Sequence, residues 1–201
     1  ANAGSGGNSC DSTFLFSAIP SVPNGSWAQI SGPGTSTFMD ATNATTEVSV
    51  SEEGQYAYQW LETNGSCSDS ATVTVNFFVQ PVADAGTGGA ECDLDVQLGA
   101  NPSVGNGTWT YSGPGTATFS PNDSDENAIA TVSDYGVYIF TWTEDNFGCT
   151  DDASITVNFN LQTTADAGDG GDECDLTFIF NATPSIGAGT WTSSGPGNAF
   201  F

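Results

Sequence analysis

The segment Gly54-Gln55-Tyr56-Ala57-Tyr58-Gln59-Trp60 decides the fold. It recurs 82 residues later as Gly136-Val137-Tyr138-Ile139-Phe140-Thr141-Trp142. In both copies a large aromatic residue occupies every second position at the end of the segment, and this period of two is typical of a strand that buries one face. Aromatic residues also favour strands. The recurrence at a fixed spacing indicates that one folding unit is repeated along the chain.

The 82-residue period continues through the rest of the chain. Cysteines and tryptophans at equivalent positions are Cys10, Cys92 and Cys174; Cys67 and Cys149; and Trp27, Trp109 and Trp191. This register predicts a first unit at 1–82, a second at 83–164, and the N-terminal part of a third at 165–201. Because the third copy stops partway through a unit, we expect the chain to be one stretch of a longer array.

Strands rather than helices are predicted throughout the units. Apolar and polar residues alternate, turn-forming Gly, Pro, Asn and Asp recur at short intervals, and no stretch has a sustained helical period. In the second unit the predicted strands lie near 93–100, 107–112, 116–119, 127–133, 136–143 and 153–160, with a short leading segment at 83–87. The predicted fold class is all-β, with tandem antiparallel β-sandwich domains of immunoglobulin-like size.

The charge of the chain is one-sided. It has 24 Asp and Glu residues and no Lys, Arg or His, so its formal net charge is −24 at pH 7. No salt bridge between side chains can form, and neither nucleic acid nor an anionic membrane is an electrostatic partner. Cations are the complementary partners, and self-repulsion would keep a long array soluble and extended.

The residue types that usually carry catalysis are missing. Without His or Lys the chain has no Ser-His triad, no Schiff-base lysine and no ordinary general base. Only a pair of carboxylates could act, as in glycoside hydrolysis, and no pair stands out. We therefore expect no enzyme activity and assign no catalytic residue. The chain also has no signal peptide and no apolar run of about 18 residues, so we expect a mature, soluble segment without direct membrane insertion.

Taken in order, the motifs resemble a known family. The second unit runs from Ala83-Asp84-Ala85-Gly86 through a cysteine, Gly105-Asn106-Gly107-Thr108-Trp109 and a Ser-Gly-Pro-Gly turn to the aromatic strand, a Gly-Cys loop and a final Thr-Val-x-Phe strand. This order is similar to the PKD-like or Ig-like repeats in very large surface adhesins of gliding bacteria, the SprB-like proteins. The resemblance covers all 201 residues. It implies an extracellular seven-stranded sandwich, type IX secretion and a location at the cell surface.

Two cysteines per unit favour an oxidising compartment and one disulfide per domain. We predict the pairs Cys10–Cys67 and Cys92–Cys149, and we expect the partner of Cys174 beyond the end of the chain. In a standard immunoglobulin topology, however, the residue before strand B lies at the end opposite the F–G loop. Linkage between neighbouring units is therefore the alternative pairing. Metal binding by the cysteines is disfavoured, because no His and no Cys-x-x-Cys pair is present.

Acidic loops of consecutive units are predicted to meet at the junctions, because the E–F loop of one sandwich and the F–G loop of the next both face the linker. The candidate ligands are Glu52, Glu53, Asp84, Glu144 and Asp145 at the first junction, and Asp134 and Asp166 at the second. Oxygen ligands without competing bases suit Ca²⁺, which would stiffen the joint. The alternative is that these carboxylates are only solvated loop charges.

Most aromatic residues are predicted to be buried. The repeated tryptophans Trp27, Trp109 and Trp191 match the core Trp on strand C of sandwich domains. Tyr111 and Phe147 are the only candidates for outward-facing rings that could bind sugar. Candidate glycosylation sites are Asn24, Asn43, Asn64, Asn106, Asn122 and Asn181 in sequons, and Ser70 in a short motif like the O-glycosylation signal of the bacteria that the family resemblance suggests.

Two classes of function remain. The first is a non-enzymatic, extracellular repeat array that forms the stalk or filament of a bacterial adhesin used in surface attachment or gliding. Its expected partners are neighbouring repeats of the same chain, other copies in a filament, and surface polysaccharide. The alternative is a set of carbohydrate-binding or spacer modules in a secreted multidomain hydrolase. Copy number separates them, because a stalk continues for many repeats whereas an accessory module soon meets a catalytic domain.

Overall fold

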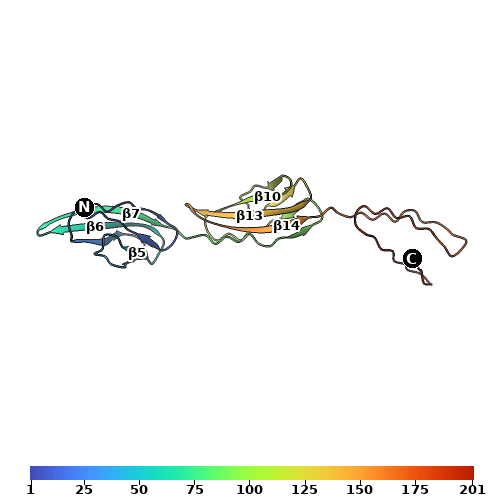
Figure 1. The fold of residues 1–201 in the computed structure, drawn as a ribbon, viewed down its shortest axis with the longest axis horizontal. Helices are drawn as coiled ribbons and strands as arrows, with labels where there is room; N and C mark the ends of the chain where they lie inside the picture. The colour runs from blue at the N-terminus through green and yellow to red at the C-terminus, as the bar shows by residue number, and fades with distance from the viewer.

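The computed structural model describes residues 1–201, and its regular structure is entirely β (Figure 1). Residues 1–82 are called domain 1, residues 83–164 domain 2, and residues 165–201 the third unit. The strands of domain 1 are β1 (Gly7–Ser9), β2 (Thr13–Leu15), β3 (Gly25–Ser31), β4 (Ser36–Phe38), β5 (Glu47–Val50), β6 (Gly54–Asn64) and β7 (Cys67–Phe77). Those of domain 2 are β8 (Gly89–Glu91), β9 (Asp95–Gln97), β10 (Asn106–Ser112), β11 (Ala117–Ser120), β12 (Ile129–Val132), β13 (Gly136–Asn146) and β14 (Cys149–Phe159).

Each domain is a sandwich of two sheets. In domain 1 the strand orders are β1-β7-β6-β3 and β2-β5-β4, and domain 2 repeats them as β10-β13-β14-β8 and β11-β12-β9. The short first strand pairs in parallel with the last strand, as β1 does with β7 and β8 with β14, and the other pairings are antiparallel. This is an immunoglobulin-like arrangement. The prediction of tandem antiparallel β-sandwich domains is confirmed.

Inward-facing aromatic residues build the two cores. Alternate residues of β6 and β13 are almost completely buried, namely Tyr56, Tyr58, Trp60, Tyr138, Phe140 and Trp142. Trp27 on β3 and Trp109 on β10 are buried as predicted, and each ring packs on the Trp of the adjacent long strand at centroid distances of 5.3 and 5.2 Å. The two cores share no residue, because one lies within 3–77 and the other within 85–159. Each sandwich is therefore packed around its own core.

Two parts of the strand prediction are wrong. The leading strand of domain 2 is β8 at 89–91 and not 83–87, because 83–86 is irregular chain with Gly86 at φ +76°. The β13–β14 hairpin is also longer than predicted, since β13 continues to Asn146 and β14 begins at Cys149. The acidic sequence there suggested a loop, yet Glu144 and Asn146 are buried on the inner face. The additional β13–β14 pairs extend the hairpin to the end of domain 2 that faces domain 1.

The third unit contains no strand, but it keeps the local geometry of the repeat. Gly168 has φ +73°, close to the +76° of Gly86. The rings of Phe180 and Trp191 pack at 4.4 Å, much as those of Phe16 and Trp27 do at 4.2 Å. Trp191 is 36% exposed, however, and is not the buried core residue that the sequence predicts.

The units follow one another in an extended line, and the tip of the β13–β14 hairpin points from domain 2 toward domain 1 (Figure 1). The linker and this hairpin therefore set the place where one domain meets the next.

The structure contains no helix with the length and hydrophobicity needed to span a membrane.

Candidate functional site: the junction between domains 1 and 2

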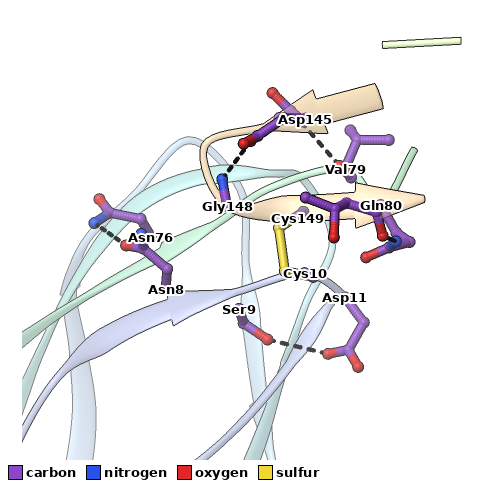
Figure 2. Close-up of a disulfide and its surroundings, with 12 residues drawn as sticks. Asn8, Ser9, Cys10, Asp11, Asn76, Val79, Gln80, Asp145, Gly148 and Cys149 are labelled. Atoms are coloured by element: carbon purple, nitrogen blue, oxygen red, sulfur yellow. Dashed lines mark hydrogen bonds between the residues drawn. A yellow bond between two sulfur atoms is a disulfide. The ribbon is translucent and has the colours of Figure 1, made fainter. Parts of the chain in front are cut away.

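A disulfide joins the two domains across the linker. Cys10 follows β1 at the end of domain 1, and Cys149 is the first residue of β14 in domain 2; their sulfur atoms are bonded, and their Cα atoms lie 5.3 Å apart (Figure 2). The bond connects residues separated by 139 positions in the chain. It is a cross-link between consecutive repeats, which is the alternative that the cysteine pattern left open.

The predicted pairs Cys10–Cys67 and Cys92–Cys149 are wrong, and strand geometry explains why. Ser9, next to Cys10, pairs with Phe77 at the end of β7, whereas Cys67 begins β7 ten residues earlier. At about 3.3 Å per residue the two cysteines of one unit lie roughly 33 Å apart, far beyond the Cα separation of a disulfide. In domain 2 the same topology separates Cys92 from Cys149. Cys67, Cys92 and Cys174 are exposed free cysteines.

The hairpin of domain 2 also holds the linker by hydrogen bonds. Three of them, each 2.8 Å, run from Asn146 Nδ2 to the Val79 carbonyl, from Gln80 Nε2 to the Thr150 carbonyl, and from Ala83 N to Asp151 Oδ2. Pro81, between these contacts, is buried. Backbone and side-chain groups of the linker are thus paired with the hairpin instead of with water, which restricts the orientation of domain 1 relative to domain 2.

An aromatic pair adds a contact beside the disulfide. The rings of Phe78 and Phe147 lie 4.8 Å apart at an interplanar angle of 19°. Phe147 sits in the two-residue hairpin turn with φ +56°, a conformation that costs most residues about 1–2 kcal/mol. The equivalent residue in domain 1 is Gly65, which has φ +62° without that cost. Domain 2 therefore carries local strain at a position where the side chain reaches the preceding domain.

Substituting Phe147 with glycine is expected to weaken the junction without harming domain 2. Gly relieves the positive-φ strain, so the thermal unfolding temperature of domain 2 should stay unchanged or rise. Loss of the ring contact with Phe78, worth about 1 kcal/mol, should lower the equilibrium constant for forming Cys10–Cys149 in a glutathione buffer about fivefold. Phe147→Tyr keeps the ring and is the matched control. An unchanged disulfide equilibrium in Phe147→Gly would show that the ring contact does not hold the domains.

Glu144 is a buried structural carboxylate, which corrects its prediction as a junction calcium ligand. Its side chain is fully buried, and its oxygens accept hydrogen bonds from Ser103 N, Ser103 Oγ, Val104 N and Trp142 Nε1 at 2.6–3.2 Å. Burial opposes ionisation, but these hydrogen bonds together outweigh it and hold the pKa of Glu144 below its ordinary value. The carboxylate is already engaged by protein donors.

This carboxylate connects the core to the linker. The Val82 amide donates to Ser103 Oγ at 2.8 Å, and the same hydroxyl donates to Glu144. Domain 1 repeats the arrangement, because Ser21 and Trp60 donate to the buried Glu62, and the pKa of Glu62 is lowered first by the Ser21 hydroxyl and then by the Trp60 indole. Between domain 2 and the third unit, the Thr164 amide donates to Ser185 Oγ, again at 2.8 Å. The Ser-to-linker contact is thus a regular part of the repeat.

The sequence contains a signal for this Ser–Glu–Trp group. Ser21 and Ser103, and likewise Glu62 and Glu144, are 82 residues apart. Each Glu also lies two residues after the buried Trp of its strand, so the period of two places it on the inner face. An acidic residue on the inward face of a repeated strand predicts a buried, hydrogen-bonded carboxylate.

The other predicted calcium ligands lie at the expected ends of the domains but do not converge. Glu52 and Glu53 are exposed just before β6, and Asp84 is exposed in the linker region. Several are engaged locally, as Asp145 Oδ1 accepts from Gly148 N, Asp134 Oδ2 from Ser133 Oγ, Asp84 Oδ1 from Gly86 N, and Asp166 Oδ1 from Gly168 N. No three His, Cys, Asp or Glu side chains gather closely enough to hold a metal ion. Calcium binding at the junctions stays a prediction from the sequence.

The predicted modification and sugar-binding residues are on the surface. Asn24, Asn43, Asn64, Asn106, Asn122, Asn181 and Ser70 are all exposed, and their glycosylation stays a prediction. Of the two outward aromatic candidates, Tyr111 is 37% exposed and Phe147 is 75% exposed. Phe147 is stacked on Phe78, so one of its faces is used by the junction.

The chain matches no protein-family model and no curated protein sequence. Solved tandem β domains are similar to it at low identity. Extracellular domains 3–5 of Drosophila OTK match with a TM-score of 0.48 and 13% identity over 78% of this chain and 58% of that one. The Clostridium thermocellum CbhA fibronectin(III)-like modules match at 0.37 and 13% over 80% and 91%, and titin domains I67–I69 at 0.41 and 14% over 81% and 65%.

Proposed function

We propose that the chain is a non-enzymatic, extracellular stalk whose consecutive sandwich domains are locked into a stiff rod. The observation that carries this proposal is the Cys10–Cys149 bond between neighbouring domains. Most tandem domains are joined by a single flexible segment, so relative motion is their default behaviour. Here the chain passes between the domains once through residues 78–83 and a second covalent connection runs beside it. Two connections oppose bending and twisting that one would allow.

Composition supports a place outside the cell. A disulfide persists in an oxidising compartment, and a chain without Lys or Arg offers no site to trypsin-like proteases. The charge of −24 keeps neighbouring units apart and favours an extended array. Together with the resemblance to repeats of gliding-bacterium adhesins, these features favour a surface adhesin that holds its binding tip, or its acidic flanks, away from the cell. Candidate targets are surface polysaccharides and other copies of the filament.

The proposal predicts a rigid two-domain rod in solution. Small-angle scattering of the oxidised protein should fit one fixed arrangement of domains 1 and 2, whereas the reduced protein should need a broader ensemble. Antibodies against this segment should also label intact cells that produce the protein. Equal flexibility in the oxidised and reduced states would overturn the stiff-rod role. Labelling only after the cells are permeabilised would overturn the extracellular location.

A further inference from the structure

One end of domain 1 reproduces the surface by which domain 2 binds its neighbour. The hairpin end of domain 2, residues 146–151, contacts domain 1 and the linker through Asn146, Cys149 and Asp151. The hairpin end of domain 1, residues 64–69, carries Asn64, Cys67 and Asp69 at the equivalent positions. It lies on a hairpin of the same length, since β6 and β7 have 11 residues each, as do β13 and β14. Backbone and side chains thus place the same three groups at the tip.

The carboxylate of this hairpin tip lies beside the first residue of its own domain, as in domain 2. Ala83 N donates to Asp151 Oδ2 at the junction. At the equivalent position of domain 1, Asp69 Oδ2 accepts from the terminal ammonium of Ala1, which is a charged group and not an amide. Cys67, the equivalent of the bonded Cys149, is exposed and free. Asn64, which corresponds to the Asn146 that binds the Val79 carbonyl, is also exposed.

The complementary end is present on domain 2. Domain 1 presents Cys10 directly after a strand whose Ser9 carbonyl accepts from Phe78 N at 2.8 Å, and domain 2 presents Cys92 after Glu91, whose carbonyl accepts from Asn160 N at 2.7 Å. Cys92 is exposed and free. Domain 2 therefore repeats the end of domain 1 that carries Cys10, but its cysteine, Cys92, forms no disulfide.

The two unpaired ends also match in what they lack. Domain 2 has Asn160 where domain 1 has Phe78, and domain 1 has Gly65 where domain 2 has Phe147. Both rings of the Phe78–Phe147 pair are therefore replaced at these two ends. If the ends met, no aromatic ring on one of them would face a polar group on the other. A junction between these ends would depend on the disulfide and the hydrogen bonds without the added ring contact.

We propose that the hairpin end of domain 1 is a docking surface for the Cys92 end of a further repeat unit of this type, closed by a disulfide to Cys67. This inference deepens the proposed stalk function and rests on it, because it makes the cross-link a property of every junction. The contact is heterologous and open, so units add head to tail without closing a ring. In forming the bond the two thiols give up two protons and two electrons to a small disulfide such as oxidised glutathione, which leaves as two thiols.

The inference is tested by adding a neighbouring unit. A second copy of residues 83–164 is fused directly before Ala1 of the full chain, which reproduces the Thr164–Ala165 connection as Thr164–Ala1. The fusion is oxidised in a glutathione buffer, blocked with an alkylating reagent and digested with pepsin, since trypsin has no site. Because the added copy repeats the sequence around Cys92, the original Cys92 is changed to serine in the fusion. Mass spectrometry should then find Cys67 bonded to Cys92 of the added unit, together with Cys10–Cys149. Cys67→Ser should return the added Cys92 to the alkylated pool, whereas Cys174→Ser should change neither bond.

The outcomes separate this inference from the stalk proposal. If Cys67 remains alkylated while Cys10–Cys149 forms, the docking surface is wrong and the stalk proposal stands. If Cys10–Cys149 itself fails to form, the stalk proposal loses its basis. A second fusion carries residues 1–82 before Ala1, so that the first cysteine of the added unit is the equivalent of Cys10. It keeps the test decisive if the first fusion does not fold, because Cys67 must bond that cysteine too.

Discussion

Replacing Cys10 with serine is expected to lower the free energy of unfolding of the oxidised chain by about 5 kcal/mol, summed over the transitions of both domains. The reason is that Cys10–Cys149 closes a loop that spans most of domain 1 and domain 2, so the bond restricts the unfolded states of both. In the substituted protein each domain should unfold as an independent unit. Urea titration followed by tryptophan fluorescence measures this, because Trp27, Trp60, Trp109 and Trp142 are buried.

Cys67→Ser is the matched control for this experiment. Cys67 is exposed and free, and surface substitutions usually change stability by no more than about 0.5 kcal/mol. Reducing the wild-type protein should reproduce the behaviour of Cys10→Ser. If Cys67→Ser were as destabilising as Cys10→Ser, the pairing within one domain would be correct and the cross-domain bond would not.

Glu144→Ala is expected to destabilise domain 2 by about 3 kcal/mol. The substitution removes the acceptor for four hydrogen-bond donors around the carboxylate, and buried donors without a partner are costly. The substitution also removes the acceptor that orients the Ser103 hydroxyl. Because this hydroxyl accepts the hydrogen bond from the Val82 amide, the linker should become more mobile. Thermal unfolding measures the first effect, and hydrogen exchange of the Val82 amide measures the second. Asp152→Ala, at an exposed position of β14, should be nearly neutral.

The same carboxylate predicts acid sensitivity. The pKa of Glu144 in the folded protein is held below the ordinary glutamate value of about 4.5, so its contribution to stability is complete above that value. The contribution is lost as the pH falls through the lowered pKa, because the protonated side chain no longer accepts all of its hydrogen bonds. Unfolding free energy should therefore decline below about pH 4.5, and Glu144→Gln should flatten that decline. A decline of equal steepness in Glu144→Gln would assign it to other carboxylates.

Strand type and core were predictable because they depend on local periodicity. The alternation that places Tyr138 and Phe140 on one face acts over a few residues, so the inner face of β13 could be inferred from the sequence. The extent of that strand could not, because Glu144 and Asn146 are polar residues buried by partners far away in the chain. The sequence predicts the correct end of domain 2 for Glu144, but not the burial of its carboxylate against Ser103 and Val104. Its environment comes from Ser103, which is 41 residues distant.

The sequence by itself determined the 82-residue repeat, the all-β fold and the presence of two cysteines in each complete unit. Which cysteine bonds with which was decided only by the tertiary structure. Every unit carries both partners, so pairing within a unit and pairing between consecutive units leave the same pattern in the sequence. In space the two differ greatly, because the length of β7 separates Cys10 from Cys67, while the hairpin of domain 2 brings Cys149 to Cys10. A disulfide forms only between sulfur atoms that the fold brings together, and here it brings them together across the domain junction.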